Sequence, residues 1–300
     1  MNFYKKLSLV DVVNLIFWLA IFIFYVISFS QSQYRLYGFV LLTGLLLFQW
    51  FILKLRARKN KKVWQKYLLL FYPAIYLIFI FDSIHTVLPY INSKVYDKEL
   101  YQIDRWLLGV DPTVWIERFI NPYTTELLYI LYFFYFPMPL IILGYLYKKK
   151  MFKALDKSIV FYFITYYGSY LLYFLVPALG PRFYPELVQK QQTSLDGLWL
   201  TDVIRNTISS LEHNKFDAFP SLHAAITLVT ILVIAKYRKK WLWVFIPVLA
   251  GIFISLIYCR YHYFIDIIAG VVWTLIAYYI VEKYYDKWYQ KYFTAYYNES

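Results

Sequence analysis

Two histidines in this sequence lie where apolar runs begin, and one of them is followed by a carboxylate. His262 and Asp266 lie four residues apart at the start of the run 262–282, and His223 lies near the start of the run 219–235. Residues four apart share a helix face, so we expect Asp266 to accept a hydrogen bond from one imidazole nitrogen of His262. The other nitrogen would then be available as a nucleophile. A carboxylate inside a membrane span costs at least about 2.5 kcal/mol, which favours a functional interpretation of Asp266.

Phosphate-binding groups accompany the two histidines. Ser221 has the position and chemistry of a helix N-cap before His223, and the starts of both histidine-bearing helices offer free N–H groups that suit an anion. Arg182 and Arg260 lie next to the ends of apolar runs and can hold phosphate oxygens as bidentate donors. The set predicts phosphoryl transfer, in which His262 attacks phosphorus and His223 protonates the leaving oxygen. It contains no cysteine cluster and predicts neither a metal site nor a cofactor.

Other ionisable residues allow two interpretations. Asp82 and His85, near the end of the run 67–88, are candidates for the substrate cavity, although a capping or helix-packing role explains them equally well. For Asp104-Arg105 and for Asp111-Pro112 we expect a surface ion pair and a turn. An interfacial role that anchors the side chain to headgroups is the alternative for Arg182 and Arg260.

The composition indicates the environment in which these residues work. Of the 300 residues 61% are hydrophobic and 23% aromatic, which is too apolar for a soluble globular chain. We therefore predict an all-α, polytopic membrane protein. Its eight candidate spans are 12–29, 37–54, 67–88, 124–147, 158–178, 219–235, 241–258 and 262–282.

The positive charges predict the orientation of these spans. The net charge is +13, but most Lys and Arg residues cluster in the segments 54–66, 148–157 and 236–240 between spans, which is typical of cytoplasmic loops and does not indicate nucleic-acid binding. Lys5 and Lys6 and the basic tail after 282 extend the pattern. Both termini are then cytoplasmic, and Arg182, His223 and His262 face the periplasm, lumen or exterior. The loops 89–122 and 179–218 lie on that side and contain amphipathic runs suited to interfacial helices.

The motifs resemble those of a known family. Phe219-Pro220-Ser221-Leu222-His223 and His262-Tyr263-Phe264-Ile265-Asp266, with Gly180-Pro181-Arg182 upstream, are similar to the three motifs of the type 2 phosphatidic acid phosphatase superfamily, and most similar to the branch of the inositol phosphorylceramide synthases. The resemblance implies a six-helix catalytic core in 67–300, two added N-terminal helices in 1–66, and a metal-independent phosphohistidine mechanism. Where the wider family has an arginine six residues before its nucleophilic histidine, this chain has Leu256.

The expected activity is therefore that of an integral-membrane lipid phosphotransferase or phosphatase. Its partners would be membrane lipids, with inositol or another alcohol as acceptor if the reaction resembles that of the synthases. A simple lipid phosphate phosphatase that uses water as acceptor is the alternative. Haem or metal binding is disfavoured because both histidines lie at span ends with a single carboxylate nearby. A non-enzymatic transporter is disfavoured because no charges accompany Pro73, Pro137 and Pro139 at membrane depth.

Overall fold

The computed structural model describes residues 7–58, 60–211 and 215–292, and over these residues the chain is helical and contains no strand. This confirms the all-α fold. Lys5, Lys6 and the end of the basic tail lie outside the described residues, so their predicted place on the cytoplasmic side is not addressed by the structure.

Each predicted span falls on a helix or on a pair of helices. Six helices in the described part of the chain are long and apolar enough to cross a membrane, and a bent pair adds a seventh candidate. The remaining predicted span is the shorter apolar helix α11. The span helices are α1 (Leu9–Ser28), α2 (Arg35–Arg56), α3 (Val63–Ile91), α6 (Pro122–Phe134), α7 (Pro137–Lys148), α8 (Phe152–Leu175), α11 (Leu222–Tyr237), α12 (Leu242–Tyr258, preceded by the short η3, Lys239–Trp241) and α13 (Phe264–Tyr292).

The fourth predicted span is broken. Helices α6 and α7 meet at an angle of 44°, and the break comes directly before Pro137. Proline lacks the N–H that would continue the backbone ladder, and its ring clashes with the preceding turn. The bend matters for function because Tyr135, at the break, packs its ring against His223, with ring centroids 4.4 Å apart.

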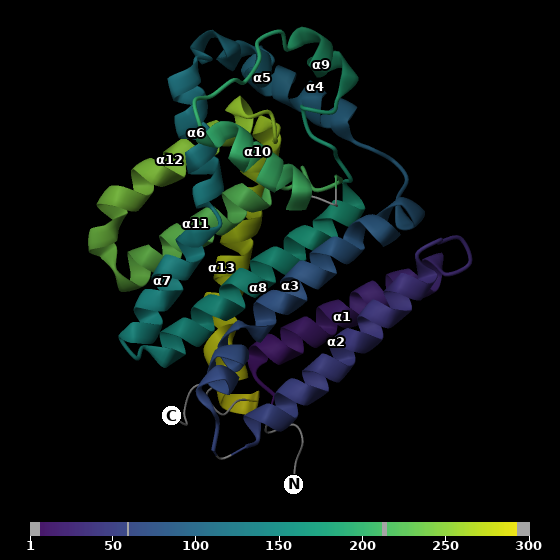
Figure 1. Cartoon of the computed structure of the whole chain (residues 1–300), viewed down its shortest axis with the longest axis vertical. Coiled ribbons are helices and arrows are strands. Elements are labelled where there is room, and N and C mark those ends of the chain that lie inside the picture. Colours follow the sequence, from purple (N-terminus) through teal and green to yellow (C-terminus); the bar gives the residue numbers. More distant parts are fainter. Residues whose placement is uncertain (1–6, 59, 212–214, 293–300) are drawn as a thin grey trace.

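Short helices between the spans gather at one end of the bundle. They are α4 (Asp97–Leu108), α5 (Pro112–Trp115), η2 (Ile116–Phe119), α9 (Pro185–Lys190) and α10 (Leu200–Leu211). Figure 1 shows them at the end opposite to the start of α1 and the end of α13. We call these five short helices the cap. Helices α4 and α10 match the two amphipathic runs expected in the loops 89–122 and 179–218.

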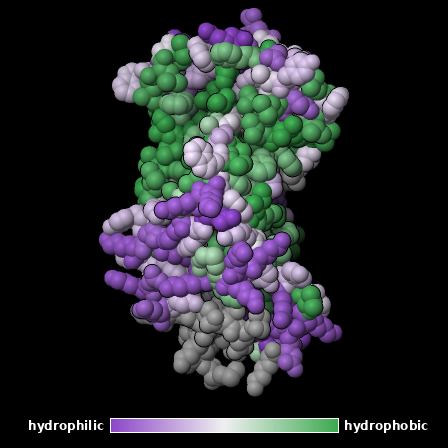
Figure 2. Space-filling view, turned by 90° about the vertical axis from the view of Figure 1, so that its left-hand side faces the viewer, coloured by the Kyte–Doolittle hydropathy of each residue, from purple (hydrophilic) through white to green (hydrophobic). Residues whose placement is uncertain are grey.

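The surface is banded in the way expected of a membrane protein. Figure 2 shows an apolar band below a thin hydrophilic rim at the cap end and above a broad hydrophilic region at the other end. Exposed apolar side chains such as Trp243, Val244 and Ile254 of α12 belong to such a lipid-facing surface. The protein is thus an integral, multi-pass membrane protein.

Helices α1, α2 and α3 pack together at the edge of the bundle (Figure 1). Near their basic end, Asp11 is fully buried and binds Arg56 of α2 and Tyr72 of α3. Near the other end of α3, Asp82 accepts a hydrogen bond of 2.8 Å from Tyr37 of α2, and the ring of His85 lies against Tyr34. The structure therefore places Asp82 and His85 at a helix contact, and their role in a substrate cavity stays a prediction. The division into an added pair and a six-helix core likewise stays a prediction.

Candidate active site

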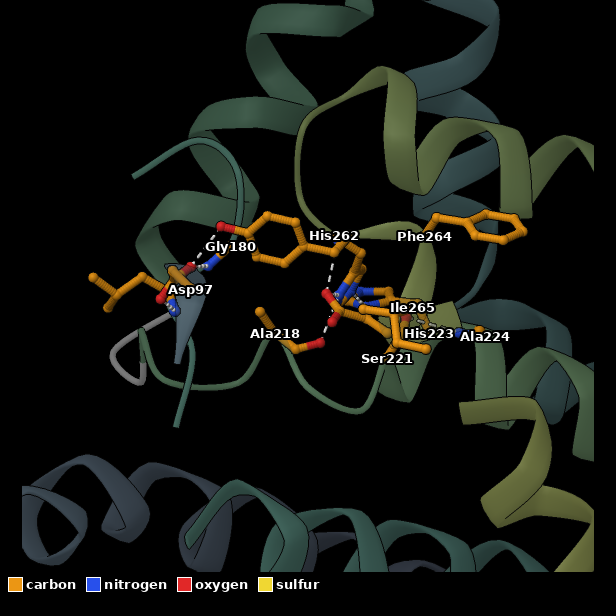
Figure 3. A network of polar contacts seen from close by, with 12 residues as sticks. Asp97, Gly180, Ala218, Ser221, His223, Ala224, His262, Phe264 and Ile265 are labelled. Carbon is orange, nitrogen blue, oxygen red and sulfur yellow. Dashed lines mark hydrogen bonds and ion pairs between the residues drawn. The ribbon is translucent and has the colours of Figure 1, made fainter. Parts of the chain in front are cut away.

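The structure brings His262 and His223 into direct contact. His262 lies in the loop 259–263 between α12 and α13, and His223 lies in the first turn of α11. Nε2 of His262 is 3.3 Å from Nδ1 of His223. Figure 3 shows the two rings together beside Ala218 and Ser221. Two residues 39 positions apart in the sequence thus form one pair, as the motifs predicted.

The tautomer of His262 is fixed by a backbone group. Its Nδ1 lies 2.9 Å from the carbonyl oxygen of Ala218, and because that oxygen can only accept, Nδ1 carries the proton. Nε2 then has a lone pair, directed toward His223. The carboxylate of Asp266 lies 3.6 Å from the same Nδ1, which is within ion-pair range but beyond a hydrogen bond. The sequence argument placed both residues on one helix face; the structure differs because α13 begins only at Phe264, so His262 is outside the helix.

Asp266 has a second task at the start of α13. Its Oδ2 accepts the backbone N–H of Tyr263 at 2.7 Å, and its side chain is fully buried. Its Oδ1 has no hydrogen-bond partner among the described residues. Asp266 therefore caps the helix start and places a carboxyl group beside the imidazole of His262, where its ionised form would stabilise an imidazolium or phosphohistidine.

We expect Asp266→Asn to lower kcat by roughly a hundredfold or more, because the amide keeps an acceptor for Tyr263 but cannot ionise to stabilise a positive charge on His262. The thermal midpoint should fall only slightly. Asp266→Ala, which removes the cap as well, should also lose about 1 kcal/mol of stability. Activity and thermal unfolding of the two variants in detergent separate the effects; near-normal turnover of Asp266→Asn would make Asp266 purely structural.

Arg182 is connected to the histidine pair through an aromatic stack. Its guanidinium carbon lies 4.3 Å from the ring centroid of Tyr261, and that ring stacks on Tyr132, which in turn packs against His223. Its backbone N–H donates to the carbonyl of Arg260 at 3.1 Å. The preceding turn requires glycine: Gly180 has a φ of +90°, and a Cβ there would lie 2.6 Å from the carbonyl oxygen of Tyr261.

Arg260 is held by the cap. Its Nη2 donates to Glu117 of η2 at 2.7 Å and to the carbonyl of Thr193 at 2.6 Å. Its backbone has a φ of 63°, in the left-handed region. Ser221 is the N-cap of α11, as expected, and its Oγ accepts the N–H of Ala224. A phosphate-binding role for Arg260 and Ser221 stays a prediction.

Asp97 and Asp104, two carboxylates of α4, were not identified as site residues from the sequence. Asp104 accepts the backbone N–H groups of Phe264 and Ile265 at 2.6 and 2.8 Å, and Arg105 pairs with Asp111 instead. The expected surface ion pair between Asp104 and Arg105 is therefore wrong, because adjacent helical residues point in different directions and Asp104 is buried. The start of α13 is satisfied by carboxylates and is therefore not available to an anion, whereas the start of α11 stays a candidate.

Burial determines the protonation states of the groups around the loop 259–263. It lowers the pKa of His262 to about 3, opposed by the hydrogen bond to Ala218 and assisted by the charge of Arg182. His262 is therefore neutral, as a nucleophile must be. Burial also raises the pKa of Asp104 to about 6 and raises that of Asp97, against the N–H groups that both carboxylates bind. Only 4% of His262 is exposed, so the closed site largely excludes water.

Metal ligation finds no support in the arrangement of these side chains. Within the described residues, no three His, Cys, Asp or Glu side chains come together in a way that suits a metal ion. The chemistry that the pair itself supports is nucleophilic attack by Nε2 of His262, with Nδ1–H of His223 as the neighbouring proton donor.

Comparison with known proteins identifies the family of this chain. The chain is 30% identical over 165 residues to a phosphoinositol dihydroceramide synthase of Bacteroides thetaiotaomicron, an alignment covering 51% of this chain and 54% of that protein. It is 25% identical over 213 residues to a PA-phosphatase related-family protein of Dictyostelium discoideum, covering 60% of this chain and 38% of that protein. The chain thus spans at most about half the length of these relatives. No solved structure matches it. Residues 98–280, which include both histidines, match the model of the PAP2 superfamily, and the chain belongs to that superfamily.

Proposed function

We propose that this protein is a lipid phosphotransferase that forms a phosphohistidine on His262 and passes the phosphoryl or phosphoryl-headgroup unit to an alcohol. The observation that carries the proposal is the contact between the two histidines. Nε2 of His262, which has the free lone pair, lies 3.3 Å from Nδ1 of His223, and Nδ1 of His262 is bonded to the carbonyl of Ala218. The relationship to a protein named as a phosphoinositol dihydroceramide synthase supports a lipid substrate.

The reaction then has two balanced steps. Nε2 of His262 attacks phosphorus, the bond from phosphorus to the lipid oxygen breaks, and that oxygen takes the Nδ1 proton of His223, which must enter this step as the imidazolium and leaves it as the neutral ring. In the second step the acceptor hydroxyl gives its proton back to His223 and attacks phosphorus, and the P–N bond breaks. Arg182 and the start of α11 offset the charge of the phosphoryl oxygens. The two rings must separate to admit phosphorus, because 3.3 Å leaves no room for it between them.

Burial of the pair favours an alcohol over water as acceptor. The site lies beneath the cap, and a site closed to solvent protects a reactive intermediate from hydrolysis. Hydrolysis of a lipid phosphate is the alternative, and it needs the same two residues. The experiment is therefore a comparison of products: purified protein in liposomes that contain a labelled phospholipid should release diacylglycerol and label an added alcohol, such as inositol or ceramide, with a chelator present. Release of free phosphate alone would establish the phosphatase, and no activity without added metal would refute the metal-independent mechanism.

We also propose that the cap and the histidine pair face the periplasm, lumen or exterior. The basic segments 54–66, 148–157 and 236–240 support this orientation because cytoplasmic loops are enriched in Lys and Arg. The cap lies at the opposite end of the bundle from the start of α1 and the end of α13 (Figure 1).

Cysteine labelling tests the orientation. In a Cys259→Ser background, Ser194→Cys should react with an impermeant thiol reagent in intact cells, whereas Asn60→Cys and Lys149→Cys should react only after the membrane is opened. All three positions are exposed, so access to the reagent depends only on the side of the membrane. Reaction of Asn60→Cys in intact cells together with protection of Ser194→Cys would invert the topology.

A further inference from the structure

Helix α4 contributes two buried carboxylates to the loops that carry the site. Asp97 and Asp104 lie two helical turns apart and are only 4% and 1% exposed. Oδ1 of Asp97 accepts the N–H of Gly180 at 2.8 Å and the hydroxyl of Tyr263 at 2.9 Å, and its Oδ2 accepts the N–H of Leu179 at 2.8 Å. Figure 3 shows Asp97 beside Gly180, at the edge of the group that contains the histidines. Asp97 therefore joins the turn before Arg182 to the residue after His262.

Asp104 binds the two residues that follow the loop 259–263. Its two oxygens accept the N–H groups of Phe264 and Ile265, which are the first two residues of α13. These N–H groups have no partner within their own helix, and a nearby Ser, Thr, Asp or Asn side chain usually binds one of them. Here Tyr263, the residue before the helix, donates its hydroxyl to Asp97 instead, and the bidentate cap comes from a helix 160 positions earlier in the chain.

The location of the hydrogen bonds to Asp97 and Asp104 indicates that they position the site as well as stabilise the fold. A buried carboxylate is costly to place unless it is well bonded, so each of these two must be offset by the N–H groups it receives. All five donors lie in two short segments, 179–180 and 263–265, which flank Arg182 and His262. A displacement of about 1 Å at a reacting group can lower a rate about a hundredfold. The two carboxylates thus act where a small shift of backbone would move the nucleophile.

We propose that Asp104, assisted by Asp97, is a positioning residue that sets the place of His262 by fixing the start of α13 to the cap. This inference rests on the proposed role of His262 as nucleophile. It gives α4 a part in phosphoryl transfer, although Asp97 and Asp104 bind neighbouring backbone and hydroxyl groups and not the two histidines themselves.

The test is Asp104→Asn, which keeps the size of the side chain but presents an amide N–H₂ to one of the two backbone N–H groups. We expect kcat to fall about a hundredfold while KM stays within about twofold, since substrate binding is left intact. Independently of activity, hydrogen exchange of the peptide 260–268 should become faster, because the amides of Phe264 and Ile265 lose a shared acceptor.

Two other carboxylates provide matched controls. Glu99→Gln removes a charge from α4 at an exposed position that pairs with Lys94. Glu126→Gln changes a buried carboxylate that accepts the N–H groups of residues 198–201 at the start of α10 instead of those at the start of α13. Both controls should leave exchange of the peptide 260–268 unchanged, and Glu99→Gln should leave kcat unchanged. Glu126→Gln measures how far the loss of any buried cap lowers activity through stability alone.

The outcomes are distinct. Unchanged exchange of 260–268 in Asp104→Asn, a kcat within about threefold of the wild type, or a loss no larger than that of Glu126→Gln at equal thermal midpoint would each overturn the positioning role. Failure of the proposed function itself would look different, because His262→Ala would then retain activity or the wild type would show no transfer, whatever Asp104→Asn does to hydrogen exchange.

Discussion

His262→Ala should abolish turnover, with a loss of about four orders of magnitude or more, because the lone pair of Nε2 has no substitute among the neighbouring groups. Nδ1 of His223, at 3.3 Å, carries a proton and cannot replace it. Both release of the lipid alcohol and labelling of the acceptor should stop, since both steps pass through the same P–N bond. The measurement is the initial rate of each product in liposomes of fixed protein content.

The matched variant for this experiment is His262→Asn. Because His262 is buried and bonded to Ala218, alanine also removes a hydrogen bond, at a cost of about 1 kcal/mol. An asparagine amide can donate to the same carbonyl and preserve the local fold while still lacking the nucleophile. Both variants should be inactive, and His262→Asn should keep a thermal midpoint close to that of the wild type. Turnover by a well-folded His262→Asn variant would contradict the covalent mechanism.

His223→Ala should have an effect that depends on the leaving group. On a lipid substrate, whose leaving alkoxide needs a proton, the rate should fall by about 10²–10⁴, whereas on a nitrophenyl phosphate it should fall by less than about tenfold. His262→Ala should lose both activities. The ratio of the two rates is measured on one preparation, so any unfolded fraction cancels.

This design protects the test from a packing artefact. The ring of His223 packs between Tyr132 and Tyr135, with centroids 4.6 and 4.4 Å away, so the alanine variant loses packing as well as a proton donor. Lost packing would lower both rates together. Equal losses on the two substrates would therefore contradict the role of His223 as general acid.

Much of the fold follows from the sequence because a membrane span is a long local signal. Apolar runs of the required length marked the helices α1, α2, α3, α8, α12 and α13, whereas the bend between α6 and α7 falls inside the run 124–147, which was predicted as a single span. The pairing of His223 with His262 was also predictable, because both lie at starts of spans that run in the same direction. Ser221 as the N-cap of α11 followed from its residue type and position alone.

The contacts that depend on tertiary structure were not predictable in the same way. The partner of Nδ1 of His262 is the backbone carbonyl of Ala218, and every residue has such a group, so no side chain signals it. Asp104 looked like one half of a surface pair because its true partners, two backbone N–H groups, lie 160 positions away. The i, i+4 argument for Asp266 depended on the first residue of α13, and helix boundaries are the least certain part of a sequence-based prediction.

The covalent intermediate is the central claim, and its mass is the most direct test. Wild-type protein mixed with a phospholipid donor, without acceptor, and quenched in base, where a phosphohistidine survives, should gain the mass of the phosphoryl or phosphoryl-headgroup unit. Fragmentation should place that mass on His262, and an added alcohol acceptor should discharge it. His262→Asn should stay at its unmodified mass. A protein that transfers the headgroup at full rate while no modified His262 appears on the time scale of a single turnover would contradict the account.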